Sequence, residues 1–146
     1  MKNVRLSLLL LINLLAVSAF SQTAQTETTF TVHASGFESN TGQAMLRLFR
    51  AGDEVPTKPF LILKVAIVNK DAVFTVKNLA YGDYAAIIVH DRNANGEIDH
   101  SFGMPSEPLG FSNNWELGLF SGMPTFEKLK FTFSKTNKSL SVNMDD

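Results

Sequence analysis

Short stretches of alternating apolar and polar residues recur along most of the chain, and this period of two is typical of β-strands with one buried face. Polar turn residues at 35–42 predict a hairpin between the first two strands, and those at 69–72 predict a hairpin between 67–68 and 73–76. Residues 60–68 also suit a short helix followed by a strand. The predicted strands cover residues 30–34, 43–50, 60–68, 73–76, 84–89, 126–133 and 139–144.

The segment 84–89 is apolar throughout, which predicts a central strand covered on both faces. A long segment rich in glycine and proline follows, up to residue 126. It excludes long regular structure, although residues 114–120 suit one helical turn. Because aromatic side chains bury large areas when they pack, we expect this loop to lie against the domain. Its aromatic residues are Phe102, Phe111, Trp115 and Phe120.

About seven short strands with glycine and asparagine turns predict an all-β protein. We expect an antiparallel β-sandwich, immunoglobulin-like or transthyretin-like, with a long loop after the central strand. A small barrel is the second possibility.

The first residues form a separate unit. Residues 6–19 are almost wholly apolar and follow a short basic start with Lys2 and Arg5, and Ser21 marks the expected cleavage point. The apolar run is about 14 residues, shorter than the roughly 20 of a membrane-spanning helix, so a signal peptide is favoured over a membrane anchor. The predicted organisation is a signal peptide over 1–21, a flexible leader over 22–29 and a single β-sandwich domain over 30–146. The mature chain is then secreted or periplasmic, without a membrane span.

The net charge limits the possible partners of the protein, and the absence of cysteine limits what can stabilise its fold. Removal of residues 1–21 changes the net charge from −1 to −3, which argues against a nucleic-acid partner because such proteins need a basic surface. The chain has no cysteine, so an exported form depends on its core for stability, with a bound metal as a possible addition.

Carboxylate and amide side chains recur at alternate positions directly after the segment 84–89. Calcium loops use positions 1, 3, 5, 7 and 9, with a glycine at position 6 that permits a sharp turn. The sequence therefore predicts a Ca²⁺ site, with a Kd on the order of 10⁻⁴ to 10⁻³ M as in extracellular modules. The matching residues are Asp91, Asn93, Asn95, Gly96, Glu97 through its backbone carbonyl, and Asp99.

The match ends at position 12, where Phe102 replaces the usual bidentate glutamate. The nearest later carboxylate, Glu107, is our candidate for closing the site. The alternative is a turn rich in Asn and Asp without a metal, since these residues and glycine are common in turns.

Two histidines, His90 and His100, bracket this loop, so a transition-metal site is a further hypothesis. The competing interpretation is that each histidine bonds to backbone at a strand end. The chain has no G-x-S-x-G nucleophile motif, and we expect no catalytic residues. A metal-dependent hydrolase that uses Asp91 or His90 is the least favoured alternative.

The segment 110–115 is a second distinctive feature because it joins aromatic rings to amides. Its ligand-binding candidates are Phe111, Asn113, Asn114 and Trp115, a combination suited to a glycan or another small ligand. The alternative is a lid over the end of the sandwich, in which the asparagines satisfy buried backbone groups.

These motifs together resemble the uncharacterised bacterial family called domain of unknown function 2141. The resemblance rests on the calcium-type loop, the segment 110–114, the late Pro124-x-Phe126 and the approach 78–85, with Ala80 where the family usually has proline. It implies a small secreted β-sandwich protein without a settled activity. We thus expect a non-enzymatic exported protein whose calcium loop shapes a surface for an unknown protein or glycan partner.

Overall fold

The computed structural model describes residues 27–118 and 120–144, so the predicted signal peptide and most of the leader lie outside the described residues. Nearly all regular structure in the described part is β-strand, which confirms the all-β class. The strands are β1 (Thr29–Ser35), β2 (Gln43–Arg50), β3 (Leu61–Val65), β4 (Asp71–Lys77), β5 (Gly82–Asp91), β6 (His100–Ser101), β7 (Met104–Pro105), β8 (Leu109–Phe111), β9 (Phe131–Phe133) and β10 (Ser139–Asn143). Two short helices, η1 (Ser112–Asn114) and α1 (Phe126–Leu129), complete the fold.

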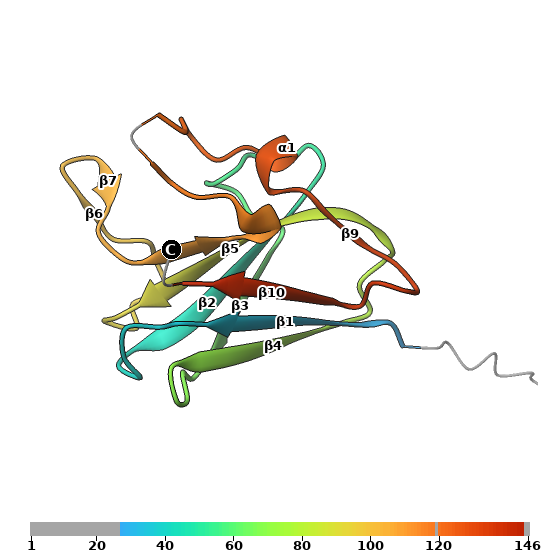
Figure 1. The fold of residues 1–146 in the computed structure, drawn as a ribbon, viewed down its shortest axis with the longest axis horizontal. Helices are drawn as coiled ribbons and strands as arrows, with labels where there is room; N and C mark the ends of the chain where they lie inside the picture. The colour runs from blue at the N-terminus through green and yellow to red at the C-terminus, as the bar shows by residue number, and fades with distance from the viewer. Residues whose placement is uncertain (1–26, 119, 145–146) are drawn as a thin grey trace, which may run out of the picture.

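The strands form two main sheets that pack as layers (Figure 1). One sheet has the order β10-β1-β4, and the other has the order β3-β2-β5-β8, with β9 also paired to β5. All of these pairs are antiparallel except β1 with β10, which run parallel. The short pair β6–β7 forms a separate hairpin. A sandwich-like fold is therefore confirmed, with one parallel pair added to the antiparallel sheets.

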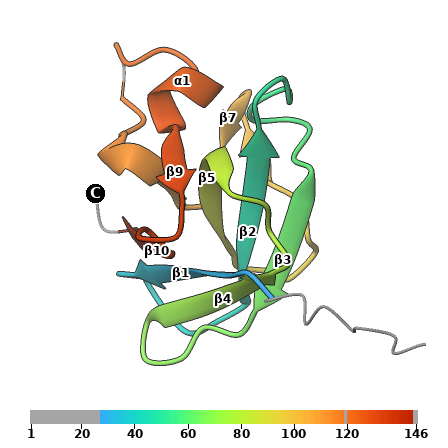
Figure 2. The ribbon, with the colours of Figure 1, turned by 90° about the vertical axis from the view of Figure 1, so that its right-hand side faces the viewer.

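The main core lies between the two sheets. Figure 2 shows β1, β4 and β10 as one layer below the strands of the larger sheet. Alternate residues of β1 and β4 point into this space, as the burial of Phe30, Val32 and Phe74 shows, and Leu46 and Ile88 meet them from the other sheet. Full burial of each such side chain stabilises the fold by roughly 1.5–3 kcal/mol.

A second core covers the opposite face of the larger sheet. Met45 and Phe49 of β2, with Ile87 and Val89 of β5, contact Phe111 and Leu129 in a separate apolar cluster. The long loop and α1 form this third layer. Strand β5 is apolar at successive positions because both of its faces are covered, which confirms its predicted central place. Met45 departs from simple alternation in β2 because it packs into this second core.

The predicted strand pairings were partly wrong. Strands β1 and β2 belong to different sheets and do not form a hairpin; β1 pairs with β4 and β10 instead. The turn at 69–72 closes only one bridge, between Val68 and Asp71, after which β4 leaves for the other sheet. Short polar turns set local direction, but the partner of a strand depends on which sheet buries its apolar face.

The predictions for the late chain also need correction. The expected strand over 126–133 is a helical turn, α1, followed by the short β9. Thr125 begins α1, and its side chain accepts a hydrogen bond from the Lys128 backbone N–H. The expected helical turn over 114–120 is not found in residues 115–118 or 120; the 3₁₀ turn η1 ends at Asn114, where the expected turn would begin. Within the described residues, no helix is long and apolar enough to cross a membrane.

Candidate functional site

Asp91 ends β5 and organises the loop that follows it. Its side chain is buried and accepts three hydrogen bonds: from the backbone N–H of Gly96 at 2.7 Å, from that of Asn95 at 3.1 Å, and from the side chain of Gln43 at 2.7 Å. Burial acts to raise the pKa of Asp91, but hydrogen bonds from Gln43, Gly96, Asn95 and the Ala94 backbone outweigh it and leave the pKa below its ordinary value. Asp91 is therefore an ionised, buried centre for the loop.

The polar side chains farther along the loop converge. The Nδ2 atoms of Asn93 and Asn95 donate to the two carboxylate oxygens of Asp99, at 2.7 and 3.0 Å. The Oδ1 atoms of the same asparagines accept the backbone N–H groups of Asn95 and Glu97. The structure thus brings three of the predicted ligands within hydrogen-bond reach of one another, while Asp91 fixes the bend beneath them.

The donor set decides which ion suits this loop. No three His, Cys, Asp or Glu side chains in residues 27–118 and 120–144 come together as a metal site. An ion here must use amide and main-chain oxygens in addition to carboxylates. Such a set of hard oxygen donors fits Ca²⁺ and does not fit the softer transition metals.

Gly96 has φ +83° and lies against the Lys64 side chain, which would occupy the space of a β-carbon.

Glu107 joins the loop to the neighbouring segment. Its side chain is buried, and its carboxylate accepts the backbone N–H of Arg92 at 2.9 Å and that of Asp99 at 3.2 Å. Glu107 therefore closes the loop by clamping its backbone at two points. Its place as a direct metal ligand stays a prediction.

Glu107 also lines a cavity of about 180 Å³ on the same end of the molecule. Acidic and amide side chains on its wall include Glu116, Asn114 and Asn143, and Trp115 supplies an aromatic surface. The remaining lining residues are Pro105, Leu109, Gly110, Phe111 and Leu117. Sequence analysis did not identify Glu116, which directly follows Trp115, or Asn143, which lies on β10 and comes to the cavity only in the folded chain.

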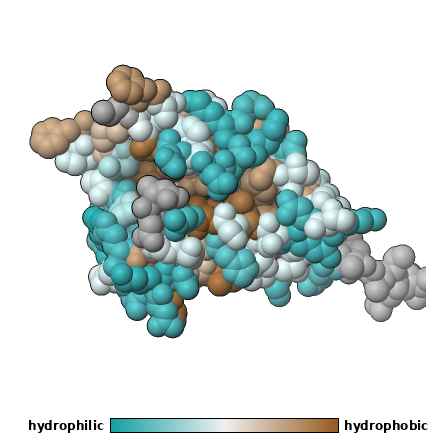
Figure 3. Space-filling model, in the orientation of Figure 1, coloured by the Kyte–Doolittle hydropathy of each residue, from teal (hydrophilic) through white to brown (hydrophobic). Residues whose placement is uncertain are grey.

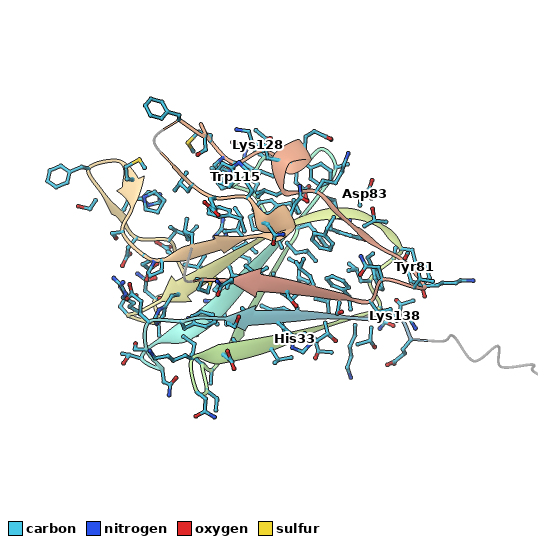
Figure 4. The ribbon with its side chains drawn as sticks, viewed as in Figure 1. His33, Tyr81, Asp83, Trp115, Lys128 and Lys138 are labelled. Atoms are coloured by element: carbon cyan, nitrogen blue, oxygen red, sulfur yellow. The ribbon has the colours of Figure 1, made fainter. Side chains whose placement is uncertain are left out.

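The predicted ligand-binding residues divide into two groups. Phe111 is buried and meets the Trp115 ring edge-on, with centroids 4.8 Å apart, while Asn113 donates to the Lys128 backbone carbonyl at 3.0 Å. Phe111 lines the cavity as a buried ring beside Trp115, whereas Asn113 is not among the lining residues and bonds to α1 instead. Trp115 and Asn114 line the cavity itself, and the Lys128 ammonium lies 5.5 Å from the Trp115 ring (Figure 4).

The two histidines that bracket the loop differ in environment. His90 is fully buried, packs edge-on against Phe37, and donates its Nε2 proton to the Thr41 carbonyl at 2.9 Å. His100 is exposed on β6. The backbone-bonding interpretation thus describes His90. Because the side chains of both His90 and Asp91 are buried, neither faces solvent where a hydrolase substrate would meet it.

Comparison with known proteins yields a family and no closer relative. Searches of the curated proteins and of the solved structures find no match to this chain. A family model described as "Uncharacterized protein conserved in bacteria (DUF2141)" matches residues 32–141. The match spans residues of both sheets, the calcium-type loop and every residue that lines the cavity except Asn143. The chain therefore belongs to this uncharacterised bacterial family.

Proposed function

We propose that the protein is an exported, non-enzymatic binding protein whose ligand site is the cavity beside Trp115, with the neighbouring loop held by calcium. The observation that carries the proposal is the double role of Glu107, which lines the cavity and clamps the loop backbone at Arg92 and Asp99. A loop held in one conformation therefore also holds Glu107, and with it this part of the cavity wall, in place.

The chemistry of the cavity favours a small polar ligand such as one sugar ring of a glycan. Its volume of about 180 Å³ is below the roughly 300–1,000 Å³ of sites for drug-sized ligands. An aromatic face beside amides and carboxylates offers stacking together with hydrogen-bond donors and acceptors for hydroxyl groups. An unknown protein partner that presents a single polar side chain is the second candidate.

Trp115 gives a direct assay, since it is the only tryptophan in the sequence. We expect saturable changes in its fluorescence on titration with one member of a panel of monosaccharides and their oligosaccharides. Asn114→Ala should weaken this response because it removes an amide from the cavity wall, whereas Lys138→Ala, at the opposite end of the molecule, should not (Figure 4). If no sugar produces a saturable change, the cavity is only part of a structural lid.

The calcium part of the proposal rests on the oxygen donors of the loop. Asn93, Asn95 and Asp99 would hold the ion with the Glu97 backbone carbonyl and Asp91, and bound Ca²⁺ would supply the positive charge that draws these oxygens together. With a Kd of about 10⁻⁴ to 10⁻³ M, 10 mM Ca²⁺ stabilises the folded state by roughly 1.4–2.7 kcal/mol. That corresponds to a rise in Tm of about 5–10 °C.

Two variants test this site by thermal unfolding in 10 mM CaCl₂ and in chelator. Asp99→Asn should lose most of the calcium-dependent rise in Tm because it removes a ligand charge. Glu97→Gln is the matched control, since position 7 of a calcium loop contributes its backbone carbonyl and not its side chain. Equal wild-type melting curves in calcium and in chelator would refute the calcium site and leave the cavity proposal standing.

A further inference from the structure

Phe102 and Phe120, at one end of the molecule, project into solvent from the long loop. We expected the aromatic residues of this segment to be buried, and Phe111 is, but Phe102 and Phe120 are fully exposed. Figure 3 shows hydrophobic side chains projecting from the body at two separate points, on the end where the β6–β7 turn and residues 120–124 lie in Figure 1. The burial prediction was wrong for these two residues.

Each ring stands on a built turn. Phe102 occupies the two-residue turn between β6 and β7 with φ +51°, a left-handed conformation that suits asparagine or glycine far better than a bulky side chain. The second turn is closed by Ser121, whose backbone N–H donates to the Gly118 carbonyl and whose hydroxyl oxygen accepts the Gly118 N–H. The fold gains no burial from either ring.

The ammonium group of Lys128 holds the second turn in place. It donates to the backbone carbonyls of Ser121 at 2.7 Å and Met123 at 2.9 Å, which ties the turn to α1. These bonds join the residues that follow Phe120 to the helical turn α1.

The surface between the two rings is also apolar. Met104, Leu117 and Met123 are partly exposed there and line a hollow of about 100 Å³ between the two loops. The sequence has no Asp, Glu, Lys or Arg over residues 101–106 or 117–126. The residues that carry the two rings therefore offer apolar side chains, and the charged groups near them in the chain or by contact include Glu116 and the Lys128 ammonium, which is bonded to backbone carbonyls.

The shape and area of this end select its partner. The two projecting phenylalanine rings by themselves offer about 300–500 Å² of apolar area, below the roughly 800 Å² that each partner contributes to a standard protein interface or a stable dimer. Two separate rings that project from the protein also insert more easily into a deformable bilayer than into a rigid protein surface. The headgroup–acyl boundary of a bilayer accepts aromatic and aliphatic side chains to a depth of about 5–10 Å.

We infer that this end of the protein docks on a lipid bilayer, with Phe102 and Phe120 inserted at the headgroup–acyl boundary. Insertion is driven by apolar burial, because neither loop carries a basic residue that would attract anionic lipid. Binding therefore depends little on lipid charge or on salt. The inference uses none of the predicted calcium ligands, and of the residues that line the cavity beside Trp115 it uses only Leu117.

Cosedimentation with phosphatidylcholine vesicles, with and without phosphatidylglycerol, tests the inference. We expect the wild type to bind both vesicle types. Phe102→Ser and Phe120→Ser should each lower the partition coefficient about ten- to a hundredfold, as expected for the loss of one buried aromatic side chain. Val73→Ser is the control: Val73 is exposed on β4, in the other sheet, and its loss should leave binding unchanged.

Three results would overturn the inference. These are an absence of wild-type binding to either vesicle, equal binding by the Phe102→Ser/Phe120→Ser double variant, and binding that requires phosphatidylglycerol. Light scattering on the same variants adds a test for self-association, and a dimer lost in the double variant would assign the two rings to a second copy of the chain instead. Because both rings are exposed, the variants should fold, which circular dichroism verifies.

Discussion

The buried carboxylate of Asp91 allows a quantitative prediction. Asp91→Asn preserves the shape of the side chain but removes its charge and replaces one acceptor oxygen with an N–H donor. The introduced amide nitrogen then faces either the two donors from Gly96 and Gln43 or the one donor from Asn95, and those hydrogen bonds are lost. A hydrogen bond to a charged group contributes about 1.5–3 kcal/mol, so we expect the free energy of unfolding to fall by roughly 2–4 kcal/mol. That is a large share of the 5–15 kcal/mol typical of a domain.

The pH dependence of this effect follows from the lowered pKa of Asp91. In the unfolded chain an aspartate has a pKa of about 3.9, above its value in the folded protein. The stabilisation from the ionised form is therefore complete above pH 4 and is lost as the pH falls through the folded pKa. The difference in unfolding free energy between wild type and Asp91→Asn should shrink between pH 7 and the acid range.

Urea unfolding in chelator, followed by circular dichroism at pH 7 and at pH 3 and below, measures both effects without a contribution from calcium. Asp83→Asn is the control, because Asp83 is exposed and bonds only to the exposed Thr132 side chain among the contacts described; it should change the unfolding free energy by less than about 0.5 kcal/mol. The reasoning fails if Asp91→Asn costs less than about 1 kcal/mol at neutral pH, or if its cost is the same at all pH values.

Two further substitutions test the packing beneath the site, both by urea unfolding. Ser112→Ala should cost about 1–3 kcal/mol, since the buried Ser112 hydroxyl oxygen accepts the Ala86 N–H and the hydroxyl proton has a backbone carbonyl as its acceptor. Gly110→Ala should cost about 1–3 kcal/mol, because the new β-carbon would lie 2.7 Å from Met144 Sδ and 2.8 Å from Val142 Cγ1. The combination with Met144→Ala should recover part of that second loss, and full additivity would show that the contact is not responsible.

Sequence reasoning places a strand best when the residue pattern alone shows whether one or both of its faces are covered. Residues 84–89 could be placed at the centre of a sheet because an uninterrupted apolar run has few other uses in a strand. The pairing of β1 could not be obtained in the same way. Its partners, β4 and β10, begin about 40 and 110 residues downstream, and the alternation of Phe30 and Val32 fits any sheet with one covered face.

At α1, a capping residue that begins a helix outweighs the alternation of apolar and polar residues that predicted a strand. Phe131 and Phe133 alternate correctly as β9, but the preceding residues follow the cap at Thr125, with Glu127 in the first turn of the helix. In the candidate site, the spacing of Asn93, Asn95 and Asp99 was sufficient to predict their convergence. The sequence also identified Glu107 as the residue that closes the loop, but its bonds to the Arg92 and Asp99 backbone N–H groups were not predictable, since only the folded loop presents those groups.

The parallel pairing of β1 with β10 has a consequence for the order in which the chain becomes structured. During synthesis from the N-terminus, β1 emerges early, and β4 follows within about 40 residues to cover one of its edges. The other edge of β1 stays open until Ser139–Asn143 leaves the ribosome. Completion of this sheet is thus a late, non-local event, and such contacts form slowly. A nascent chain therefore retains an unpaired edge on β1 through most of its synthesis, and a chaperone or another unfolded chain can bind to that edge.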